Sequence, residues 1–203
     1  MIDRRSITWS NGDWIEGNQP ILGPMDHAWW MASSVFDGAR AFGGCAPDLD
    51  RHCARLIESA ETFNMTTPLS AEEITALAWE GIKQFPTKAE LYIRPLMYFK
   101  DGFVTPDTSS TCFILTIFEA PLPEWRGITA TISSFRRPAP EAAPTNAKAS
   151  CLYPNVGRAL AEARAEGYDT AVVLDGSGNI AEFATNNLFM VRDGLVLTPV
   201  ENG

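Results

Sequence analysis

The sequence predicts an α+β fold in two domains, and three observations support this prediction. Runs that alternate apolar and polar residues, typical of strands, occur near the N-terminus and again after residue 90. Between residues 50 and 86 the apolar residues follow helical spacing instead. Residues 120–125 (Ala-Pro-Leu-Pro-Glu-Trp) contain two prolines, which restrict the chain to extended geometry. We therefore place a connector at 120–126, between a small domain (1–119) and a second part (127–203).

The first domain should begin with a hairpin over residues 6–19. Asn11-Gly12 separates two short alternating runs there, and both positions of such a turn need positive φ. An amphipathic helix is expected over 50–65, packing on a sheet. The capping box Ser70-Ala-Glu-Glu73 predicts the start of a second helix, which Pro86 would close.

Strands are expected next over residues 90–99 and 111–118. Pro95 lies inside the first of these strands and has no N–H to donate, which predicts an edge, a bend or a bulge there.

The second part should open with a strand over 127–135. A helix over 154–166 should end at Gly167, because glycine is preferred just after a helix. Strands over 170–174 and 179–184 follow, and Asp193-Gly194 should form the turn of a last hairpin.

Composition excludes several classes of function. The chain has 203 residues, of which 45% are hydrophobic, so it can bury a sizeable core. Its formal net charge of -9 argues against nucleic acid or an anionic membrane as a partner. No apolar run has the length of a membrane span, and residues 1–5 lack the apolar core of a signal peptide, which predicts a cytoplasmic protein. The four cysteines are scattered without a CxxC pair, so reduced thiols are expected rather than a metal site or disulfides.

Lys148 is the candidate nucleophile. It stands among small residues in Thr145-Asn-Ala-Lys-Ala-Ser-Cys-Leu-Tyr-Pro154, just before the predicted helix. A lysine amine becomes nucleophilic when desolvation or neighbouring cations keep it partly neutral. On residue type alone, a solvated surface charge is the commoner role.

Arg40 is a candidate ligand for a phosphate group. Its planar guanidinium stays charged and presents a fork of donors that suits a phosphate dianion. On charge alone, an ion pair with Asp37 or Asp48 would be the favoured alternative. Arg136 and Arg137, before Lys148, could likewise line an anion site or be solvated.

Two further features leave their alternatives open. Arg94, close to Tyr92, could bind a substrate carboxylate or be an exposed strand arginine. Glu182 lies in an otherwise apolar strand pair, where a carboxylate is costly unless it has a partner or faces solvent.

Five ordered blocks, spread over nearly the whole chain, carry a family resemblance. They are Ser34-Val-Phe-Asp-Gly-Ala-Arg-Ala-Phe42, Arg51-His-Cys-Ala-Arg-Leu56 with Ser59-Ala60, Tyr92-Ile-Arg-Pro95, the stretch from Lys148 to Tyr153, and Asn179-Ile-Ala-Glu-Phe-Ala-Thr-Asn-Asn-Leu-Phe189. Together these blocks resemble the class IV pyridoxal-phosphate (PLP) aminotransferases, the group that includes branched-chain amino-acid aminotransferase.

The resemblance implies a role for each candidate residue. Lys148 would form a Schiff base with PLP and later move a proton between the substrate α-carbon and the cofactor. Glu182 would keep the pyridine nitrogen protonated, and Tyr153 would hydrogen-bond the ring 3-oxygen. Arg40 would grip the phosphate. Tyr92 and Arg94 would lie close to the substrate.

The resemblance also implies the fold and assembly. Members of this family have fold type IV, with a small α+β domain and a larger, mostly-β PLP-binding domain. The cofactor lies between the domains, and a second subunit completes the site, so a homodimer is expected. Family members continue beyond the position of Gly203 with a phosphate-binding turn and helix, so the C-terminal part is expected to be missing and the 203 residues alone could be inactive.

The favoured function is transamination between an amino acid, of branched-chain type, and a 2-oxo acid. Segments 102–106 and 117–123 differ from typical branched-chain enzymes. (R)-amine transaminases, D-amino-acid transaminases and aminodeoxychorismate lyase therefore remain alternatives within the family. A cofactor-free Schiff-base lyase would need Lys148 but neither Arg40 nor Glu182, and a non-catalytic fragment would need none of the three.

Overall fold

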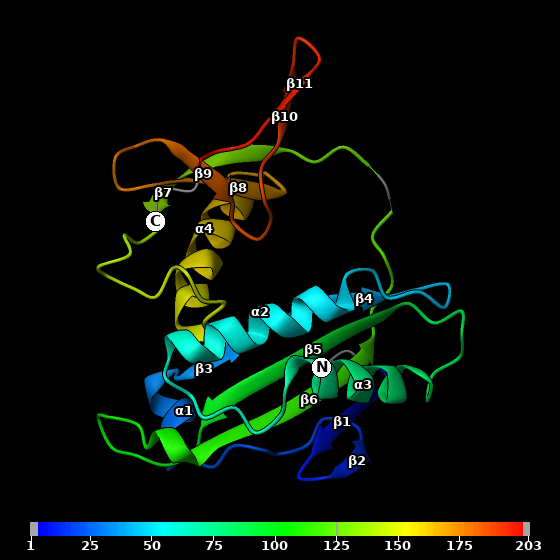
Figure 1. Cartoon of the computed structure of the whole chain (residues 1–203). Helices are drawn as coiled ribbons and strands as arrows, with labels where there is room; N and C mark the ends of the chain where they lie inside the picture. The colour runs from blue at the N-terminus through cyan, green and yellow to red at the C-terminus, as the bar shows by residue number, and fades with distance from the viewer. Residues whose placement is uncertain (1–3, 125, 201–203) are drawn as a thin grey trace. The chain divides into compact units, whose positions relative to one another are not determined.

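The structure is a computed structural model that describes residues 4–124 and 126–200 (Figure 1). Trp125 of the predicted connector, residues 1–3 and the C-terminal residues 201–203 lie outside the described part. Contacts divide the chain into two compact units. The first unit contains Met1–Pro123 and Ala147–Cys151, and the second contains Glu124–Asn146 and Leu152–Gly203. The segment that carries Lys148 thus belongs with the first unit.

The first unit is built on an antiparallel sheet. Its strands run in the order β2-β1-β6-β5-β3, and β4 also pairs with β5. The strands are β1 (Ser6–Ser10), β2 (Asp13–Glu16), β3 (Ser34–Phe36), β4 (Ala39–Ala41), β5 (Leu91–Phe99) and β6 (Thr111–Glu119).

Local signals in the sequence predicted much of this unit correctly. The N-terminal hairpin is confirmed: β1 pairs with β2 around Asn11 and Gly12, whose φ values are 53° and 99°. The second helix is capped as expected, because the Ser70 side chain accepts from the Glu73 N–H while the Glu73 side chain accepts from the Ser70 N–H. The short strands β3 and β4 were not predicted.

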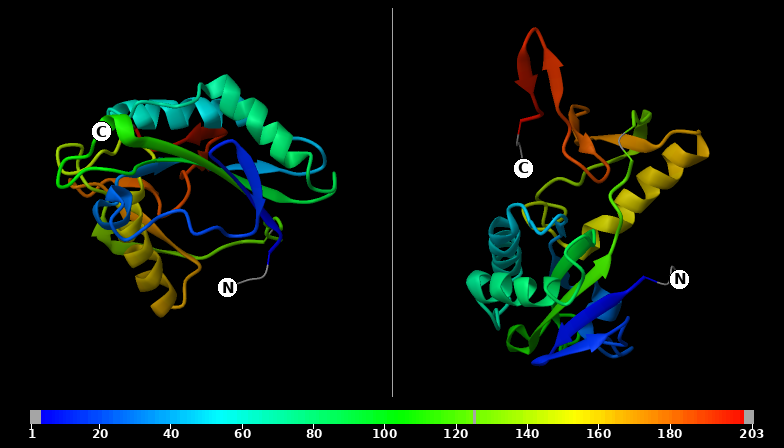
Figure 2. Two further views of the ribbon diagram at one scale, coloured as in Figure 1. Left: turned by 90° about the horizontal axis from the view of Figure 1, so that it is seen from below. Right: turned by 90° about the vertical axis from the view of Figure 1, so that its right-hand side faces the viewer.

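Two long helices cover one face of this sheet. They are α2 (Leu49–Thr62) and α3 (Ala71–Ile82), which lie side by side in Figures 1 and 2, and a short helix, α1 (His27–Met31), precedes them. Apolar residues of the helices and strands are completely or almost completely buried between them, among them Leu56, Ile74, Ile93, Leu115 and Ile117. The expected amphipathic packing of a helix on a sheet is confirmed.

Of the three features that Pro95 suggested, an edge, a bend or a bulge, the structure excludes the sheet edge. β5 is an interior strand that pairs with β6 along its whole length. On its other side, β3 pairs with residues 96–98 and β4 pairs with residues 91–93. Pro95 therefore lies opposite the turn between β3 and β4, where the ladder is interrupted and the missing N–H costs no strand hydrogen bond.

The second unit contains a three-stranded sheet and one helix. β7 (Ala130–Arg136) runs parallel to β8 (Thr170–Leu174), and β9 (Ile180–Phe183) pairs antiparallel with β8. The helix α4 (Tyr153–Ala165) lies between β7 and β8 in sequence and packs against both. Gly167 follows this helix with a φ of 86°, as the sequence predicted.

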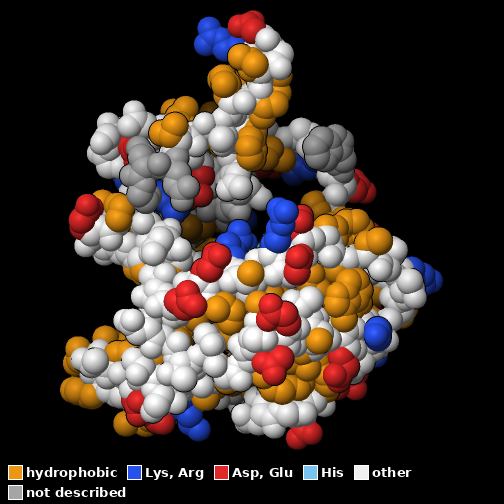
Figure 3. Space-filling view, in the orientation of Figure 1, with side chains coloured by type: hydrophobic (Ala, Val, Ile, Leu, Met, Phe, Trp, Pro, Cys, Tyr) orange, Lys and Arg blue, Asp and Glu red, His pale blue; other side chains and the backbone are white. Residues whose placement is uncertain are grey.

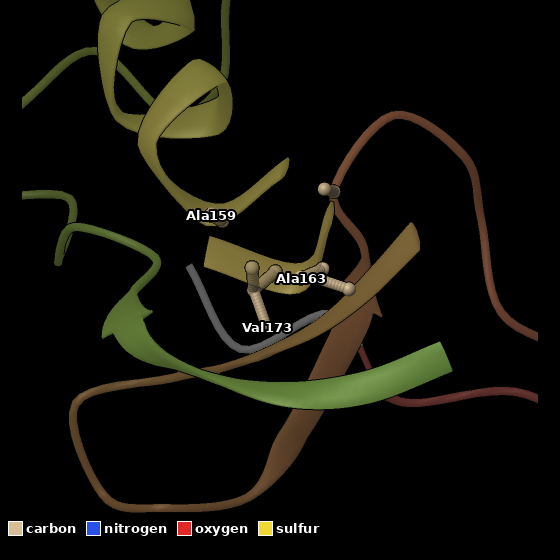
Figure 4. Packing of buried hydrophobic residues seen from close by; sticks show 5 residues of the cluster. Ala159, Ala163 and Val173 are labelled. Atoms are coloured by element: carbon tan, nitrogen blue, oxygen red, sulfur yellow. The ribbon is translucent and has the colours of Figure 1, made fainter. Parts of the chain in front are cut away.

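Small residues allow α4 to lie close to the sheet (Figure 4). Ala159 and Ala163 are one helical turn apart and pack with three residues of the strand layer, which are Ala171, Val173 and Ala184. Glu162, which directly precedes Ala163, accepts hydrogen bonds from Ser133 and Ser134 of β7, and these bonds lower the pKa of its carboxyl. Apolar packing and polar contacts thus both fix the helix to the sheet.

The last hairpin of the second unit exposes apolar side chains. It consists of β10 (Met190–Arg192) and β11 (Leu195–Leu197), joined by Asp193 and Gly194 as predicted. Its strands expose Met190, Val191, Leu195, Val196 and Leu197, and Figure 3 shows orange side chains gathered along it. Among the described residues, no helix has the length and apolar character needed to cross a membrane.

The alanine contact of α4 leads to a stability prediction. Ala163→Leu places three extra carbon atoms where the side chain is fully buried, which should lower the free energy of unfolding by about 1–3 kcal/mol. Ala161→Leu is the matched control, because Ala161 is exposed on the same helix and leucine is a good helix former. Urea unfolding of both variants is the measurement, and equal stabilities would contradict the described packing.

Candidate active site

The backbone around Lys148 is held between β3 and α2 of the first unit. Ala149 forms an antiparallel bridge with Val35, and the Phe36 N–H donates to the Lys148 carbonyl at 3.0 Å. On the other side, the Lys148 N–H donates to Ser59 Oγ at 3.0 Å. These contacts give the base of the Lys148 side chain a fixed position, although the residue lies in a connecting segment.

The Lys148 side chain is half-buried beside an aromatic ring. Its Nζ lies 5.3 Å from the centre of the Phe36 ring, a cation–π arrangement. Ala147 and Ala149, the residues on either side, are buried. Small buried neighbours leave room for a flat group next to the amine.

Three predicted site residues come together on one face of the first sheet. Arg40 of β4 is paired with Tyr92 of β5. Tyr92 and Arg94 are two residues apart on β5, so their side chains lie on the same side of the strand. The Tyr92 and Phe118 rings lie 5.3 Å apart, and the Arg94 guanidinium lies 5.7 Å from the Phe118 ring. Phe36, opposite Leu96, shares this face.

The Arg40 guanidinium is directed toward the end of the first unit. It donates to the Ala120 carbonyl at 2.8 Å and to the Pro121 carbonyl at 3.5 Å, and it lies 5.9 Å from the Tyr92 ring. Asp37 and Asp48, the partners considered from the sequence, pair instead with Arg55 and Arg51. Arg40 therefore lies on the same sheet face as the candidate substrate residues Tyr92 and Arg94.

Asp37 forms an ion pair with a different basic residue, Arg55 of α2. The contact is bidentate: Arg55 Nε donates to Oδ2 at 2.6 Å and Nη2 donates to Oδ1 at 2.8 Å. His52 Nδ1 lies 2.8 Å from Oδ1, and the Gly38 N–H donates to the same oxygen at 2.7 Å. Burial raises the pKa of the Asp37 carboxyl, but the hydrogen bonds from Arg55 and His52 outweigh burial and lower it. The carboxylate is therefore held in its charged form.

Glu182 of the second unit also has an arginine partner. Arg137 Nη1 donates to Glu182 Oε1, and Arg137 Nη2 donates to the Thr145 carbonyl at 3.2 Å. Glu182 and Arg137 are both about one third exposed. Oε2 accepts no hydrogen bond from the part of the chain that the structure describes, so one edge of a fixed carboxylate is available to a donor.

Arg137 and Glu182 line a pocket that lies within the second unit. Its volume is about 730 Å³, and Thr145, Asn146 and Asp175 also contribute to its wall. Tyr153, the remaining predicted cofactor residue, is half-buried at the start of α4. Tyr153 and Glu182 thus belong to the second unit, whereas Lys148, Arg40, Tyr92 and Arg94 belong to the first.

Two ion pairs of these sites could not be assigned from the sequence. The sequence offered Arg137 only as one of two arginines before Lys148, and it gave Arg55 no partner. The usable signal was the cost of burying a carboxylate, which called for a partner for Glu182 without saying which one.

Comparisons with known proteins identify the class to which this fold and these residues belong. The family model described as amino-transferase class IV matches residues 34–203. An aminotransferase from Brucella abortus bound to the cofactor PLP has a similar structure, with a TM-score of 0.96 and 50% identity, over 98% of this chain and 72% of that one. The fold is that of the fold type IV aminotransferases.

Branched-chain enzymes are also similar to the chain. A probable branched-chain-amino-acid aminotransferase from Rickettsia felis is 34% identical over 95% of this chain and 67% of its own length. The branched-chain amino acid aminotransferase structure from Escherichia coli has a TM-score of 0.86 and 31% identity, over 97% of this chain and 67% of that one. The chain belongs to the class IV aminotransferase family, enzymes that transfer amino groups, and it spans about two thirds of the length of these relatives.

Gly38 gives a direct test of the first-unit site. A Cβ built at this position would overlap the Tyr92 hydroxyl, so Gly38→Ala should displace Tyr92 and lower the free energy of unfolding by about 1–3 kcal/mol. In a Tyr92→Ala background the same change should cost less than about 0.5 kcal/mol, because the overlapping atoms are gone.

The control is Gly157→Ala on α4, where an added Cβ meets nothing within 4 Å. That variant should be as stable as the parent chain or more stable. Denaturant unfolding of the set measures the coupling, and an equal cost of Gly38→Ala in both backgrounds would contradict the described approach of Tyr92 to residue 38.

Proposed function

We propose that this chain catalyses PLP-dependent transamination between an amino acid of branched-chain type and a 2-oxo acid. The observation that carries the proposal is the placement of Lys148, a lysine held by its backbone between β3 and α2 with its amine over Phe36. Relatives named as branched-chain aminotransferases, and a similar structure bound to PLP, support the substrate class and the cofactor.

The residues present suit PLP. When bound, this cofactor supplies a pyridinium ring that accepts the negative charge of a deprotonated substrate α-carbon. Lys148 would hold its aldehyde carbon as a Schiff base, yield that position to the substrate amine, and then move the proton at the substrate α-carbon. A fixed backbone, which this structure gives Lys148, is what both tasks require.

Glu182 and Tyr153 would fix the ring from the second unit. Arg137 donates a hydrogen bond to Oε1 of Glu182. Oε2 would accept a hydrogen bond from the protonated ring nitrogen of the cofactor. A carboxylate there keeps that nitrogen protonated, because the opposite charge favours the charged form. The Tyr153 hydroxyl would donate to the ring 3-oxygen.

Two arginines are candidates for the cofactor phosphate. Similarity to the family favours Arg40, whose guanidinium already donates to two backbone carbonyls near residue 120. The geometry of the first unit favours Arg55, because Ser59, one turn further along α2, donates to the Arg55 carbonyl and accepts the Lys148 N–H. We assign the phosphate to Arg55 and keep Arg40 as the alternative, to be tested with it.

The substrate would lie against the sheet face that carries Tyr92 and Arg94. Arg94 is exposed and positively charged, which suits a carboxylate, while Phe36 and Phe118 supply apolar surface for a branched side chain. The same residues would also accept the donors of (R)-amine or D-amino-acid transaminases and of aminodeoxychorismate lyase, so the donor is a matter for experiment.

A homodimer in the cytoplasm completes the proposal. The first unit exposes a cluster of large apolar side chains around α1, where the Trp30 and Phe103 rings lie 5.6 Å apart. Its members are Met25, Trp29, Trp30, Phe103 and Val104. Exposed apolar groups of this size are typical of protein–protein contacts, which supports a second copy as the partner.

The decisive test of function is a donor panel assayed with PLP and 2-oxoglutarate. L-Leucine, L-isoleucine and L-valine should be the preferred donors over D-alanine and (R)-1-phenylethylamine. Lys148→Ala should lower the rate at least about 10³-fold, because it removes both the covalent attachment and the proton carrier.

Lys88→Ala, which removes an exposed lysine of the first unit, is the control and should keep the parent rate. Full transamination by Lys148→Ala would contradict the proposal. Preference for D-alanine or the (R)-amine would replace the substrate class while leaving the role of Lys148 intact.

A further inference from the structure

Phe118 of β6 is an aromatic ring that two of the candidate substrate residues share. It is paired with Tyr92 of β5 across the sheet, and the two rings lie 5.3 Å apart at an interplanar angle of 37°. The Arg94 guanidinium lies 5.7 Å from the centre of the same ring. A guanidinium at this distance is attracted to an aromatic ring, because the face of the ring carries partial negative charge. Phe118 therefore contacts both residues through its ring.

The direction of the Arg94 side chain depends on this contact. Thr116, which lies directly opposite Arg94 on β6, is a small residue. Arg94 is exposed, and it forms no hydrogen bond or ion pair with any residue that the structure describes. An arginine side chain with this freedom loses considerable conformational entropy when it binds a ligand. The Phe118 ring limits that freedom before the ligand arrives.

The Tyr92 hydroxyl is placed by contacts on both sides of its ring. Phe118 packs on one side, and the Arg40 guanidinium lies 5.9 Å from the ring centre. The hydroxyl reaches the turn between β3 and β4, where a Cβ at Gly38 would overlap it. Within the described part of the chain, this hydroxyl makes no hydrogen bond. The Tyr92 hydroxyl and the Arg94 guanidinium are thus two donors that are available to an acceptor and that contact one ring.

We infer that Phe118 is a positioning residue that orients Tyr92 and Arg94 for a substrate carboxylate. A carboxylate accepts hydrogen bonds from several donors at once, so it binds better when the donors are already oriented. The inference rests on the proposed function, in which the substrate lies against this face of the sheet. The competing explanation is that Phe118 supplies only apolar surface, which would favour every ligand of the same shape, charged or neutral.

The test compares 4-methylvalerate with its neutral amide, 4-methylvaleramide, as ligands of the PLP-loaded chain. Both carry the branched side chain of leucine, but only the acid is charged. Phe118→Leu keeps an apolar side chain and removes the ring. The ratio of acid affinity to amide affinity should fall about two- to fivefold, which corresponds to the loss of one exposed cation–π contact. An unchanged ratio would overturn the inference, even if both affinities fell.

Three further variants separate orientation of Arg94 from damage to the sheet. Phe118→Tyr keeps the ring and should keep the parent ratio. In an Arg94→Gln background, Phe118→Leu should change the ratio by less than about 1.5-fold, because the cation is gone. Phe113→Leu is the matched control: it removes a buried ring from the opposite face of β6 and should lower stability without changing the ratio. An equal fall of the ratio in Phe113→Leu, or in Phe118→Tyr, would contradict the positioning role.

NMR spectroscopy of the Arg94 side chain separates this inference from the proposed function, because it requires no catalysis. In the chain without PLP, 4-methylvalerate should shift the Arg94 Nε signal, and Phe118→Leu should weaken this binding by about two- to fivefold. No shift in the parent chain, or equal binding by both proteins, would overturn the role of Phe118. If the two proteins differ as expected but the chain neither binds PLP nor transfers amino groups, the proposed function is wrong and the role of Phe118 in carboxylate binding stands.

Discussion

The pairing of residues 148–149 with β3 is the constraint on which the site depends. Val35 and Ala149 form a bridge, and Phe36 donates to the Lys148 carbonyl, so a segment that follows the connector by more than twenty residues is held in the first unit. Ser59 of α2 takes the Lys148 N–H from the other side. With its backbone fixed on both sides, Lys148 has a set position from which its long side chain can reach a cofactor.

Each unit pairs a carboxylate with an arginine in a way that serves the chemistry proposed for it. Arg137 holds one oxygen of Glu182 and leaves the other toward a donor, which suits a protonated ring nitrogen. Asp37 holds Arg55 along one edge, which suits a phosphate. In the first pair the arginine orients the carboxylate, and in the second the carboxylate orients the arginine. Burying the Asp37 carboxylate without its partner would be costly.

Local signals predicted the long helices and strands but not β3 and β4, whereas the ion pairs depend on long-range contacts. Asn11-Gly12, the capping box at Ser70 and Gly167 act within a few residues, and each was predicted correctly. Asp37 and Arg55 are 18 residues apart, and Arg137 and Glu182 are 45 apart, so only the folded chain selects these partners. The surroundings of Pro95 were left open between an edge, a bend and a bulge for the same reason: the interruption between β3 and β4 that accommodates it cannot be seen from β5 alone. At Lys148, residue type alone favoured a surface charge, and the prediction of a nucleophile came from the family resemblance.

The most direct test of the central claim, that Lys148 carries the cofactor, is covalent trapping. The purified chain is mixed with PLP, its visible absorption spectrum is recorded, and borohydride reduction is followed by peptide mapping. The account predicts a yellow protein with the reduced cofactor on the peptide that contains Lys148. A cofactor trapped on another lysine, or a protein that stays colourless both as the 203-residue chain and when extended beyond Gly203, would contradict it.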